Sequence, residues 1–416
     1  MRVGIQGWGS EGDLRPLIAL AARLRRGGHE VRLVLSLIDE MDYGPLCQRL
    51  GVPLQVVPER MQYSLRGICQ ASRSADPSKV SRELLDQAFF PHLEEMYAAA
   101  QALCAKSDVV IGLFSSWYVK AACLASGTPF VAVHYYPGLV PSREVPPIGF
   151  PSWRWLNRVS WALFGALIDL GFRASAARFF ASKGLPPVRH ALPDVLLSER
   201  LNLLATSPTL FPPAPDWGAL HSVCGEFVLS DDDVPWQPSP SLRQFLESGE
   251  KPVLASLGTM EHLAPERAKD LLLGAVRQAK VRAVIQTKSQ GVEEGQDGEV
   301  YFLRWAPHRQ LVPLCRAMVL HGGAGTTHAA LRGGVPAVTV PFIFEQRLWG
   351  NLLHRAGSAT APLSFWKATP EKLAERIREA ATSEVMRQRA SALASASAAE
   401  DGTGTATRLL ERLELR

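Results

Sequence analysis

The stretch MVLHGGAGTTHAAL, residues 318–331, decides the fold because an apolar strand here leads directly into a glycine-rich loop and a helix. Residues 318–321 predict a buried strand, and residues 326–332 predict a helix. The three glycines between them let backbone N–H groups approach a ligand closely, and a helix N-terminus adds partial positive charge. We therefore expect an anion-binding loop that suits a diphosphate. The GxxxxGK[ST] pattern of P-loop ATPases is absent from the sequence.

Side chains of this loop add further hydrogen-bond donors to the backbone amides. His321 and the hydroxyls of Thr326 and Thr327 can each donate to a phosphate. A lone histidine beside glycines is more often structural, but the complete loop favours the binding role. About twenty residues on, Glu345 and Gln346 place a carboxylate beside an amide, which matches neighbouring sugar hydroxyls, although an exposed polar turn would look the same.

Two other segments come directly after predicted strands of the second half of the chain. Ser256, Gly258 and Thr259 form a turn of small residues after the first predicted strand of the second half of the chain. Trp305 follows another strand and suits stacking on a base, although a core tryptophan explains it equally well.

Strand and helix patterns alternate on both sides of a proline-rich stretch at residues 207–236. This alternation predicts an α/β protein with two doubly wound parallel sheets whose strand ends border a cleft. Strands are expected at residues 2–6, 31–37, 108–113, 130–134, 252–256, 283–287, 300–303, 318–321 and 337–340, with one short strand at 223–229. Helices are expected at residues 14–26, 265–280 and 326–332. The predicted divisions are residues 1–215, a linker at 216–240, a second domain at 241–395 and a tail helix at 396–416 that packs back on the first domain.

Composition limits the function classes. The 416 residues are 47% hydrophobic and 20% charged, with a net charge of +5, so a disordered scaffold, a nucleic-acid groove and a polybasic membrane patch are all disfavoured. The six cysteines form no CxxC pair, which disfavours a disulfide scaffold or a zinc site. No secretory signal pattern begins the chain, and a cytoplasmic protein is expected. Oligomeric state is not predicted.

Residues 159–172 are the most apolar run in the chain. The run is shorter than a bilayer span and contains Asp169, so it predicts no membrane span. A buried helix or an apolar pocket wall is the favoured interpretation, and contact with a membrane surface stays open.

The first glycine-rich loop allows a different function. Gly7, Gly9 and Gly12 form a GxGxxG after the first strand, and Asp39 follows the second strand, as in a dinucleotide-binding fingerprint. This pattern makes an NAD- or FAD-dependent oxidoreductase the alternative of another class. Against it, Asp13 would repel a pyrophosphate at that helix end. Asp13 itself is equally well explained as an N-cap and as a carboxylate base.

Taken together, these segments resemble the GT-B glycosyltransferases, in particular bacterial natural-product glycosyltransferases that act on vancomycin-type aglycones, and sterol glucosyltransferases. The match covers HGGAGTTHAALRGGVPAVTVPFIFEQRLWGNLLHRAG at residues 321–357 and GSEGDLRPLIALAARLRRGGHEV at residues 9–31. The middle of the chain, about residues 55–205, resembles the family only in layout, as expected for the part that recognises the acceptor.

The resemblance implies a role for each matching residue. Asp13 would be the general base, with Ser10 and Glu345 as supporting residues, and Glu345 is also a rival for the base role. Trp305 and Ala306 would border the nucleobase, and Glu345 and Gln346 would hold the transferred sugar. The implied diphosphate-binding residues are Ser256, Gly258, Thr259, His321, Gly323, Ala324, Gly325 and Thr326. The expected acceptor-pocket residues are His134, Tyr135 and Trp153.

The implied reaction is inverting, metal-independent transfer of a hexose from a nucleotide sugar to a hydroxyl of a lipophilic small molecule. UDP-glucose is the first donor considered, because a deoxysugar would leave the polar Glu-Gln pair unsatisfied; a dTDP-deoxyhexose is second. The family's Asp-Gln pair is Glu-Gln here, and Ala329 stands where plant relatives carry a ribose-binding Glu. Asp231-Asp232-Asp233 contains a DxD metal pattern, but its position in the proline-rich linker favours a solvated charge run. A sugar-nucleotide-binding protein without activity is a third alternative.

Overall fold

The computed structural model describes residues 1–39, 41–59, 83–147, 150, 153–288 and 292–413, and its chain divides into two compact units. Of the described residues, the first unit contains those up to Leu229 together with those from Glu400 onward. The second unit contains Ser230–Ala399. The first unit therefore extends beyond the predicted boundary at residue 215. The chain returns to it after the second unit, at Glu400.

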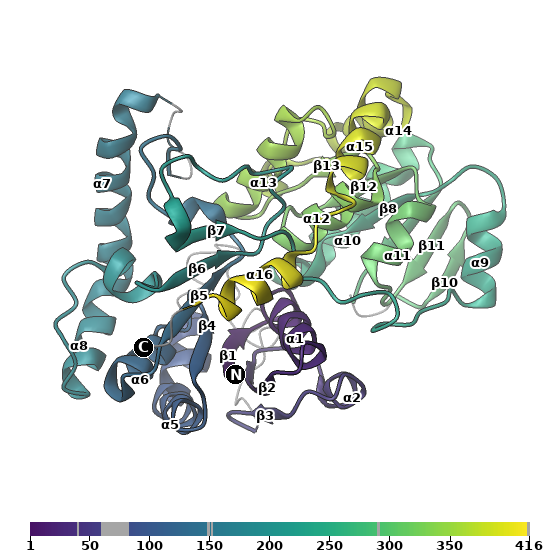
Figure 1. Ribbon diagram of the computed structural model, residues 1–416. Helices are drawn as coiled ribbons and strands as arrows, with labels where there is room; N and C mark the ends of the chain where they lie inside the picture. The colour runs from purple at the N-terminus through teal and green to yellow at the C-terminus, as the bar shows by residue number, and fades with distance from the viewer. Residues whose placement is uncertain (40, 60–82, 148–149, 151–152, 289–291, 414–416) are drawn as a thin grey trace. The chain divides into compact units, whose positions relative to one another are not determined.

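The first unit is built on a seven-stranded parallel sheet with the order β3-β2-β1-β4-β5-β6-β7 (Figure 1). Its strands are β1 (Arg2–Gly9), β2 (Glu30–Leu37), β3 (Leu54–Val56), β4 (Val109–Leu113), β5 (Phe130–His134), β6 (Leu201–Leu204) and β7 (His221–Val223). The central strands β4 and β5 are buried at every residue, as expected for a sheet covered on both faces. The predicted strand at residues 223–229 is wrong, because the strand in this region is β7, which ends at Val223. β7 pairs with Asn202, Leu203 and Leu204 of β6.

Helices and short helical turns connect these strands. The longer ones are α1 (Glu11–Arg26), α2 (Gly44–Arg49), α5 (Leu93–Cys104), α6 (Trp117–Ser126), α7 (Asn157–Ile168), α8 (Ala174–Ser182) and α16 (Gly402–Glu411). The turns are η1 (Leu85–Phe89), η2 (Phe90–His92), η3 (Pro137–Leu139), η4 (Arg154–Leu156), η5 (Asp169–Arg173), η6 (Leu192–Leu196) and η7 (Gly218–Leu220). α1 buries Leu14, Leu17 and Ile18 completely, and each such side chain contributes about 1.5–3 kcal/mol. α16 packs against α1, so the end of the chain completes the first unit.

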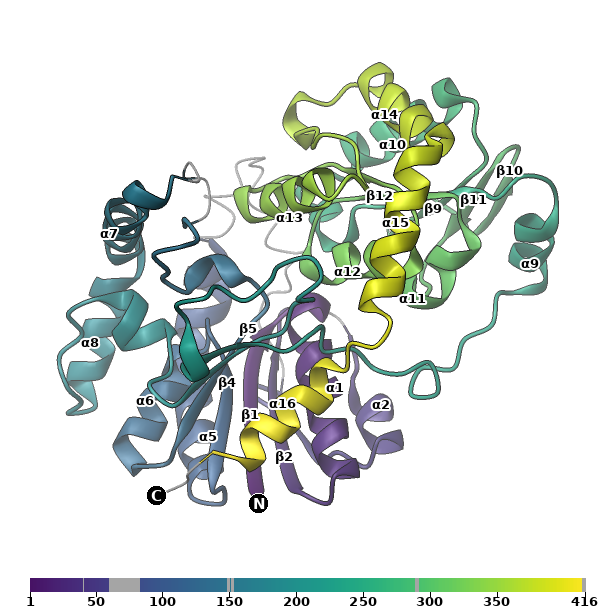
Figure 2. The same ribbon diagram turned by 45° about the horizontal axis from the view of Figure 1, so that its top comes forward.

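The apolar run at residues 159–172 lies in a continuous helical segment, Arg154–Ser182, formed by η4, α7, η5 and α8. The prediction that this run is a buried helix is wrong, because Leu163, Leu167 and Leu170 are exposed. The alternative of an apolar pocket wall stays a prediction. By length and composition alone, this segment could cross a membrane, unlike the shorter run read from the sequence. Figures 1 and 2 show α7 at the side of the first unit.

The second unit contains a six-stranded sheet with the order β10-β11-β9-β8-β12-β13. Its strands are β8 (Val253–Ser256), β9 (Ala283–Gln286), β10 (Gly295–Asp297), β11 (Val300–Leu303), β12 (Ala317–Leu320) and β13 (Ala337–Thr339). All neighbouring pairs are parallel except β10 and β11. The order reverses between β8 and β12, which makes their carboxyl ends the topological switch point where ligands bind in open α/β sheets.

Helices cover both faces of this sheet (Figure 2). They are α9 (Pro240–Glu247), α10 (Pro265–Ala279), α11 (His308–Leu311), α12 (Ala324–Gly333), α13 (Phe344–Arg355), α14 (Pro370–Thr382) and α15 (Glu384–Ser397), with turns η8 (Gly258–Leu263), η9 (Val312–Leu314) and η10 (Phe365–Lys367). α10 and α14 pack together on one face, burying Leu271, Val276, Leu373 and Ile377 over the central strands. α15 packs against α12.

Candidate active site

The predicted anion-binding loop lies at the switch point of the second unit. β12 ends at Leu320, and α12 begins at Ala324 with Gly323 as its N-cap. The neighbouring strand β8 ends at Ser256 and continues into Gly258, which has a positive φ of 58°. A Cβ on Gly258 would lie 3.0 Å from Cε1 of His321, so the two strand ends are in close contact. Their proximity agrees with the sequence prediction that both segments share one edge.

His321 is held as a neutral ring between two glycines. A Cβ added to Gly323 would collide with Nε2 of the ring, and Nδ1 is buried with no hydrogen-bond partner among the described residues. Burial lowers the pKa of His321 to about 4, and His308 nearby adds to this effect. A neutral imidazole carries one N–H, and this ring is thus able to donate one hydrogen bond to a bound anion without bringing a full charge.

The first turn of α12 contains the remaining groups of the predicted anion-binding loop. Ala324, Gly325 and Thr326 are its first three residues, whose backbone N–H groups have no partner within the helix. Gly325 is exposed, and a Cβ there would meet open space. The Thr326 hydroxyl donates to the Gly323 carbonyl at 3.1 Å, whereas the Thr327 hydroxyl is buried without a partner among the described residues. The open amides lie at the positive end of the helix dipole, where anions are stabilised.

α13 brings the predicted sugar-binding pair to the same loop. Gly322 has φ of 90°, and a Cβ there would lie 2.6 Å from the Gln346 carbonyl oxygen. Gln346 is buried, and its Oε1 accepts the backbone N–H of Phe342 at 2.8 Å and that of Ile343, the N-cap of α13, at 3.4 Å. Because these bonds occupy the Gln346 oxygen, its NH₂ is the group that would contact a sugar in the predicted role. Glu345 accepts a hydrogen bond from Trp349 Nε1 at 3.3 Å.

The predicted base-binding residues lie between β11 and α11, after the strand that neighbours β9. Trp305 is half-buried, and Ala306 is 3% exposed. Ser256 is buried at the end of β8, and its hydroxyl accepts the Gly258 N–H at 3.4 Å. Thr259 follows in η8.

In the first unit, Asp13 forms a capping box at the start of α1. Its Oδ2 accepts the backbone N–H of Ser10 at 2.9 Å and the Ser10 hydroxyl at 3.1 Å. Burial raises the pKa of the Asp13 carboxyl, and the two hydrogen bonds from Ser10 oppose that rise. The prediction that Asp13 is the N-cap is wrong by position, because Ser10 is the N-cap of α1 and Asp13 is the N3 residue that completes the capping box. The general-base role of Asp13, which a raised pKa would suit, stays a prediction.

The amides of the first glycine-rich loop are already occupied by carboxylates. Ser10 N–H donates to Asp13, and Glu11 N–H donates to Asp39 Oδ2 at 2.6 Å. Gly9 has φ of 144°, and a Cβ there would lie 2.5 Å from Asp13 Oδ2. A pyrophosphate would have to displace these carboxylates, so the oxidoreductase alternative based on Gly7, Gly9 and Gly12 is not supported.

The three predicted acceptor residues lie in different surroundings. His134 has no exposed surface, stacks with Phe114 and lies 3.3 Å from Asn202 Oδ1, so acceptor contact would require its neighbours to move. Tyr135 donates its hydroxyl to the Asp13 carbonyl at 2.6 Å and thereby supports the start of α1. Trp153 is 55% exposed.

The acidic run at 231–233 is engaged in local contacts. Asp231 pairs with Arg309 at 3.3 Å, and Asp233 accepts the Ser230 N–H at 3.0 Å. In the described part of the chain, no group of three or more His, Cys, Asp or Glu side chains is arranged to hold a metal ion.

Sequence reasoning missed Glu261, a buried carboxylate in η8. It accepts the Thr287 hydroxyl at 2.9 Å and the Lys288 N–H at 2.6 Å, and burial raises the pKa of Glu261 while these bonds lower it. It thus ties the turn after β8 to the end of β9. Nothing in its local sequence distinguishes it from a surface glutamate.

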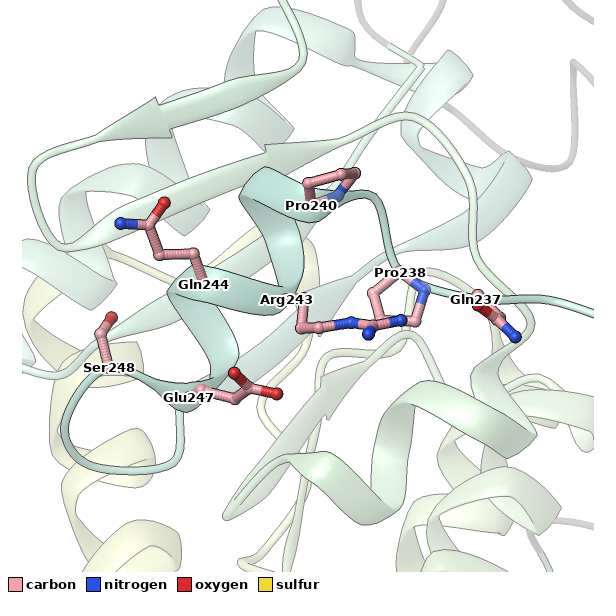
Figure 3. Close-up of a pocket in the computed structure, with 7 residues that line it drawn as sticks. All are labelled: Gln237, Pro238, Pro240, Arg243, Gln244, Glu247 and Ser248. Atoms are coloured by element: carbon pink, nitrogen blue, oxygen red, sulfur yellow. The ribbon is translucent and has the colours of Figure 1, made fainter.

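A separate surface pocket lies around α9, on the side of the second unit where β10 forms the sheet edge (Figure 3). Its lining contains none of the predicted site residues and consists of Gln237, Pro238, Pro240, Arg243, Gln244, Glu247 and Ser248.

Two doubly wound units, the second with the predicted anion-binding loop at its switch point, have the architecture of the GT-B fold, and comparison with known proteins agrees. The family model for the erythromycin biosynthesis protein CIII-like C-terminal domain matches residues 272–412. The solved structure of the glycosyltransferase VinC in complex with dTDP has a TM-score of 0.64 at 19% identity and covers 99% of each chain, which shows the shared fold.

The relatives of known sequence that this chain resembles include glycosyltransferases of natural products and of sterols. The O-mycaminosyltylonolide 6-deoxyallosyltransferase of Streptomyces fradiae is 29% identical, over 99% of this chain and 97% of its own. The vancomycin aglycone glucosyltransferase of Amycolatopsis orientalis is 28% identical, with the same coverage. A sterol 3-beta-glucosyltransferase of Arabidopsis thaliana is 27% identical over 96% of this chain and 63% of its own. The protein is a glycosyltransferase that resembles these natural-product and sterol enzymes.

Proposed function

We propose that the protein transfers a hexose, with inversion, from a nucleoside diphosphate sugar to a hydroxyl of a lipophilic small molecule in the cytoplasm. The observation that carries this proposal is the loop at the start of α12. It combines open helix amides with the neutral, half-buried His321 ring and lies against the first turn of α13, which contains Glu345 and Gln346. Such a site suits a diphosphate with a hydroxylated group attached.

The proposed mechanism uses groups of this chain without a metal. The acceptor oxygen attacks the anomeric carbon while the bond from that carbon to the diphosphate oxygen breaks. Asp13 takes the acceptor proton as the new bond forms. The amides of α12 and the N–H of His321 stabilise the negative charge that builds on the leaving diphosphate. Direct displacement inverts the anomeric centre.

The donor is proposed to be UDP-glucose, with a dTDP-deoxyhexose as the second candidate. The Glu345-Gln346 pair favours a hydroxylated hexose. The second candidate is favoured by the named 6-deoxyallosyl transfer of one relative and by dTDP in one solved structure.

A thermal-shift panel of UDP, UDP-glucose, dTDP, GDP, NAD and FAD tests the donor class. A ligand at 100 times its Kd adds about 2.7 kcal/mol of apparent stability. We expect stabilisation by a uridine or thymidine diphosphate, and stabilisation only by NAD or FAD would reject the proposal. Full turnover in excess EDTA is expected for the metal-independent mechanism, and loss of turnover that added Mg²⁺ restores would contradict it.

A further inference from the structure

A stripe of large apolar side chains runs along the segment Arg154–Ser182, and the described residues of the first unit do not cover it. The stripe, which we call the α7 face, consists of Trp155, Val159, Leu163, Leu167 and Leu170. Their spacing of three or four residues places them on one side of the helix. Trp155 is 78% exposed and Leu170 is 84% exposed. A contiguous exposed apolar patch of this kind marks an interaction site.

The opposite side of the helix is fastened to the first unit. Asn157 donates to the Arg143 carbonyl at 2.9 Å, and Trp161 Nε1 donates to the Val145 carbonyl at 2.8 Å. Further along, Phe179 packs edge-on against Trp117 at 5.2 Å. A helix held along one side and apolar along the other is suited to lying in an interface rather than crossing a bilayer.

The charge on the helix is almost entirely positive. Between residues 154 and 182 there are four arginines and one acidic residue, Asp169. The carboxylate of Asp169 already accepts the Ala191 N–H at 2.6 Å and pairs with His190 at 3.1 Å. Arg158 and Arg173 are exposed beside the apolar stripe. Basic and apolar groups together match a surface of anionic headgroups over acyl chains.

Tryptophan at the start of the helix fits the same surface. Trp153 and Trp155 are both exposed and stack with ring centroids 6.2 Å apart and an interplanar angle of 2°. Indole rings concentrate at the headgroup level of membranes, where one part of the ring is apolar and the N–H is wet.

We propose that the α7 face docks this protein on the surface of an anionic lipid bilayer. A second copy of the chain fits less well, because a symmetric contact would bring the same positive surface against itself. The proposal does not depend on the donor or on the catalytic residues.

Vesicle co-sedimentation of the full chain tests the proposal, with phosphatidylcholine vesicles that contain or lack phosphatidylglycerol. We expect binding to the anionic vesicles that weakens with added salt. In the double variant Leu163→Ser/Leu167→Ser, we expect the affinity for vesicles to fall roughly ten-fold for each leucine replaced. Each replacement removes several apolar carbon atoms from the interface with the lipid. Arg158→Gln/Arg173→Gln should weaken binding to anionic vesicles and leave binding to neutral vesicles unchanged.

Val385→Ser is the matched control, because Val385 is 69% exposed but lies on α15 in the second unit. It should bind vesicles as the unchanged protein does. Circular dichroism checks that each variant keeps its helix content. Absence of binding to anionic vesicles, or equal binding by the leucine double variant, would overturn the proposal. A dimer that binds no vesicles and dissociates when the leucines are replaced would assign the face to a second copy.

Discussion

Asp13 combines a structural and a chemical task within one side chain. Its hydrogen bonds to Ser10 begin α1, while burial raises the pKa of its carboxyl. Because the folded pKa lies above the unfolded value, the folded state binds more protons across that interval. Desolvation of Asp13 therefore opposes stability at neutral pH, and this opposition fades as the pH falls through the folded pKa. Carboxyl groups whose pKa is raised although this lowers the stability of the fold are typical of catalytic sites.

Replacing Ser10 with alanine is expected to move the acid limb of the pH profile of kcat/KM to higher pH. The Ser10 hydroxyl donates to Asp13 and lowers the pKa of its carboxyl, so its removal raises that pKa further. Initial rates between pH 4 and 9 provide the measurement. An acid limb that stays in place or moves to lower pH would contradict the role of Asp13 as base.

His321 is expected to contribute one hydrogen bond to the donor diphosphate. A hydrogen bond to a charged group contributes about 1.5–3 kcal/mol. His321→Ala should therefore weaken nucleoside diphosphate binding by about ten- to a hundred-fold in calorimetric titration. His321→Gln, which keeps an N–H donor, should lose less. Equal losses in both variants would show that the ring acts only by packing.

The lowered pKa of His321 also predicts how stability varies with pH. The folded pKa of about 4 lies below the ordinary value of about 6.5, so the unfolded state takes up a proton first as the pH falls. The free energy of unfolding contributed by this site is thus lost between about pH 6.5 and 4. In urea unfolding, His321→Gln should lose less stability between pH 7 and pH 5 than the unchanged protein, by on the order of 1 kcal/mol. An identical pH dependence in both proteins would refute the assignment.

At the scale of elements, the binding loop depends on close packing between β12, α12 and β8. Gly323→Ala is expected to disrupt it, because the added Cβ would collide with the His321 ring at the N-cap of α12. We expect a lower melting temperature without ligand and weaker diphosphate binding. Gly325→Ala is the control for stability, since a Cβ there meets open space and alanine favours a helix. Equal melting temperatures for the two variants would argue against this packing.

Local patterns predict the elements that bury continuous apolar runs. β5 and β11 have the predicted bounds, β8 begins one residue later than predicted, and β12 begins and ends one residue earlier than predicted. β10 has no such signal, because Gly295–Asp297 is polar and becomes a strand only by pairing with β11. The exposure of the α7 face was equally unpredictable, since an apolar run does not reveal whether the rest of the chain covers it.

The same limit applies to the site. Loop composition predicts that the segments after β8 and β12 share an edge, and the contact of Gly258 with His321 agrees. Sequence periodicity does not predict which side chains pair across the fold. Three such pairs are Gln346 with the Phe342 N–H, Glu261 with the Thr287 hydroxyl, and Tyr135 with the Asp13 carbonyl. The binding and catalytic roles of the site residues stay predictions.

At the scale of the whole molecule, the end of the chain completes the first unit. Glu400 accepts the hydroxyls of Ser207 and Thr209, each at 2.7 Å, and Asp401 pairs with Arg23 at 3.0 Å. These bonds fix the start of α16, which packs on α1, the helix that contains Asp13 in its first turn. The C-terminal residues therefore support the helix that carries the proposed base.

Gly402→Ala is expected to destabilise the first unit by roughly 1–3 kcal/mol, because the new Cβ would collide with the backbone carbonyls of Gly225 and Glu226. Urea unfolding measures the change. The control is Gly165→Ala on α7, where a Cβ meets open space and a helix gains stability. Equal stability of the two variants would show that α16 is not held against this segment.

The Asp13→Asn variant tests the central claim most directly, because it separates sugar transfer from donor binding. Nucleoside diphosphate release is measured with UDP-glucose or a dTDP-deoxyhexose and a panel of lipophilic alcohols and phenols, and donor affinity is measured on the same preparation. A general base contributes about 10²–10⁴-fold. The predicted result is a fall in kcat of this size with a donor Kd unchanged within about two-fold. An Asp13→Asn protein that keeps the kcat of the unchanged protein would contradict the mechanism.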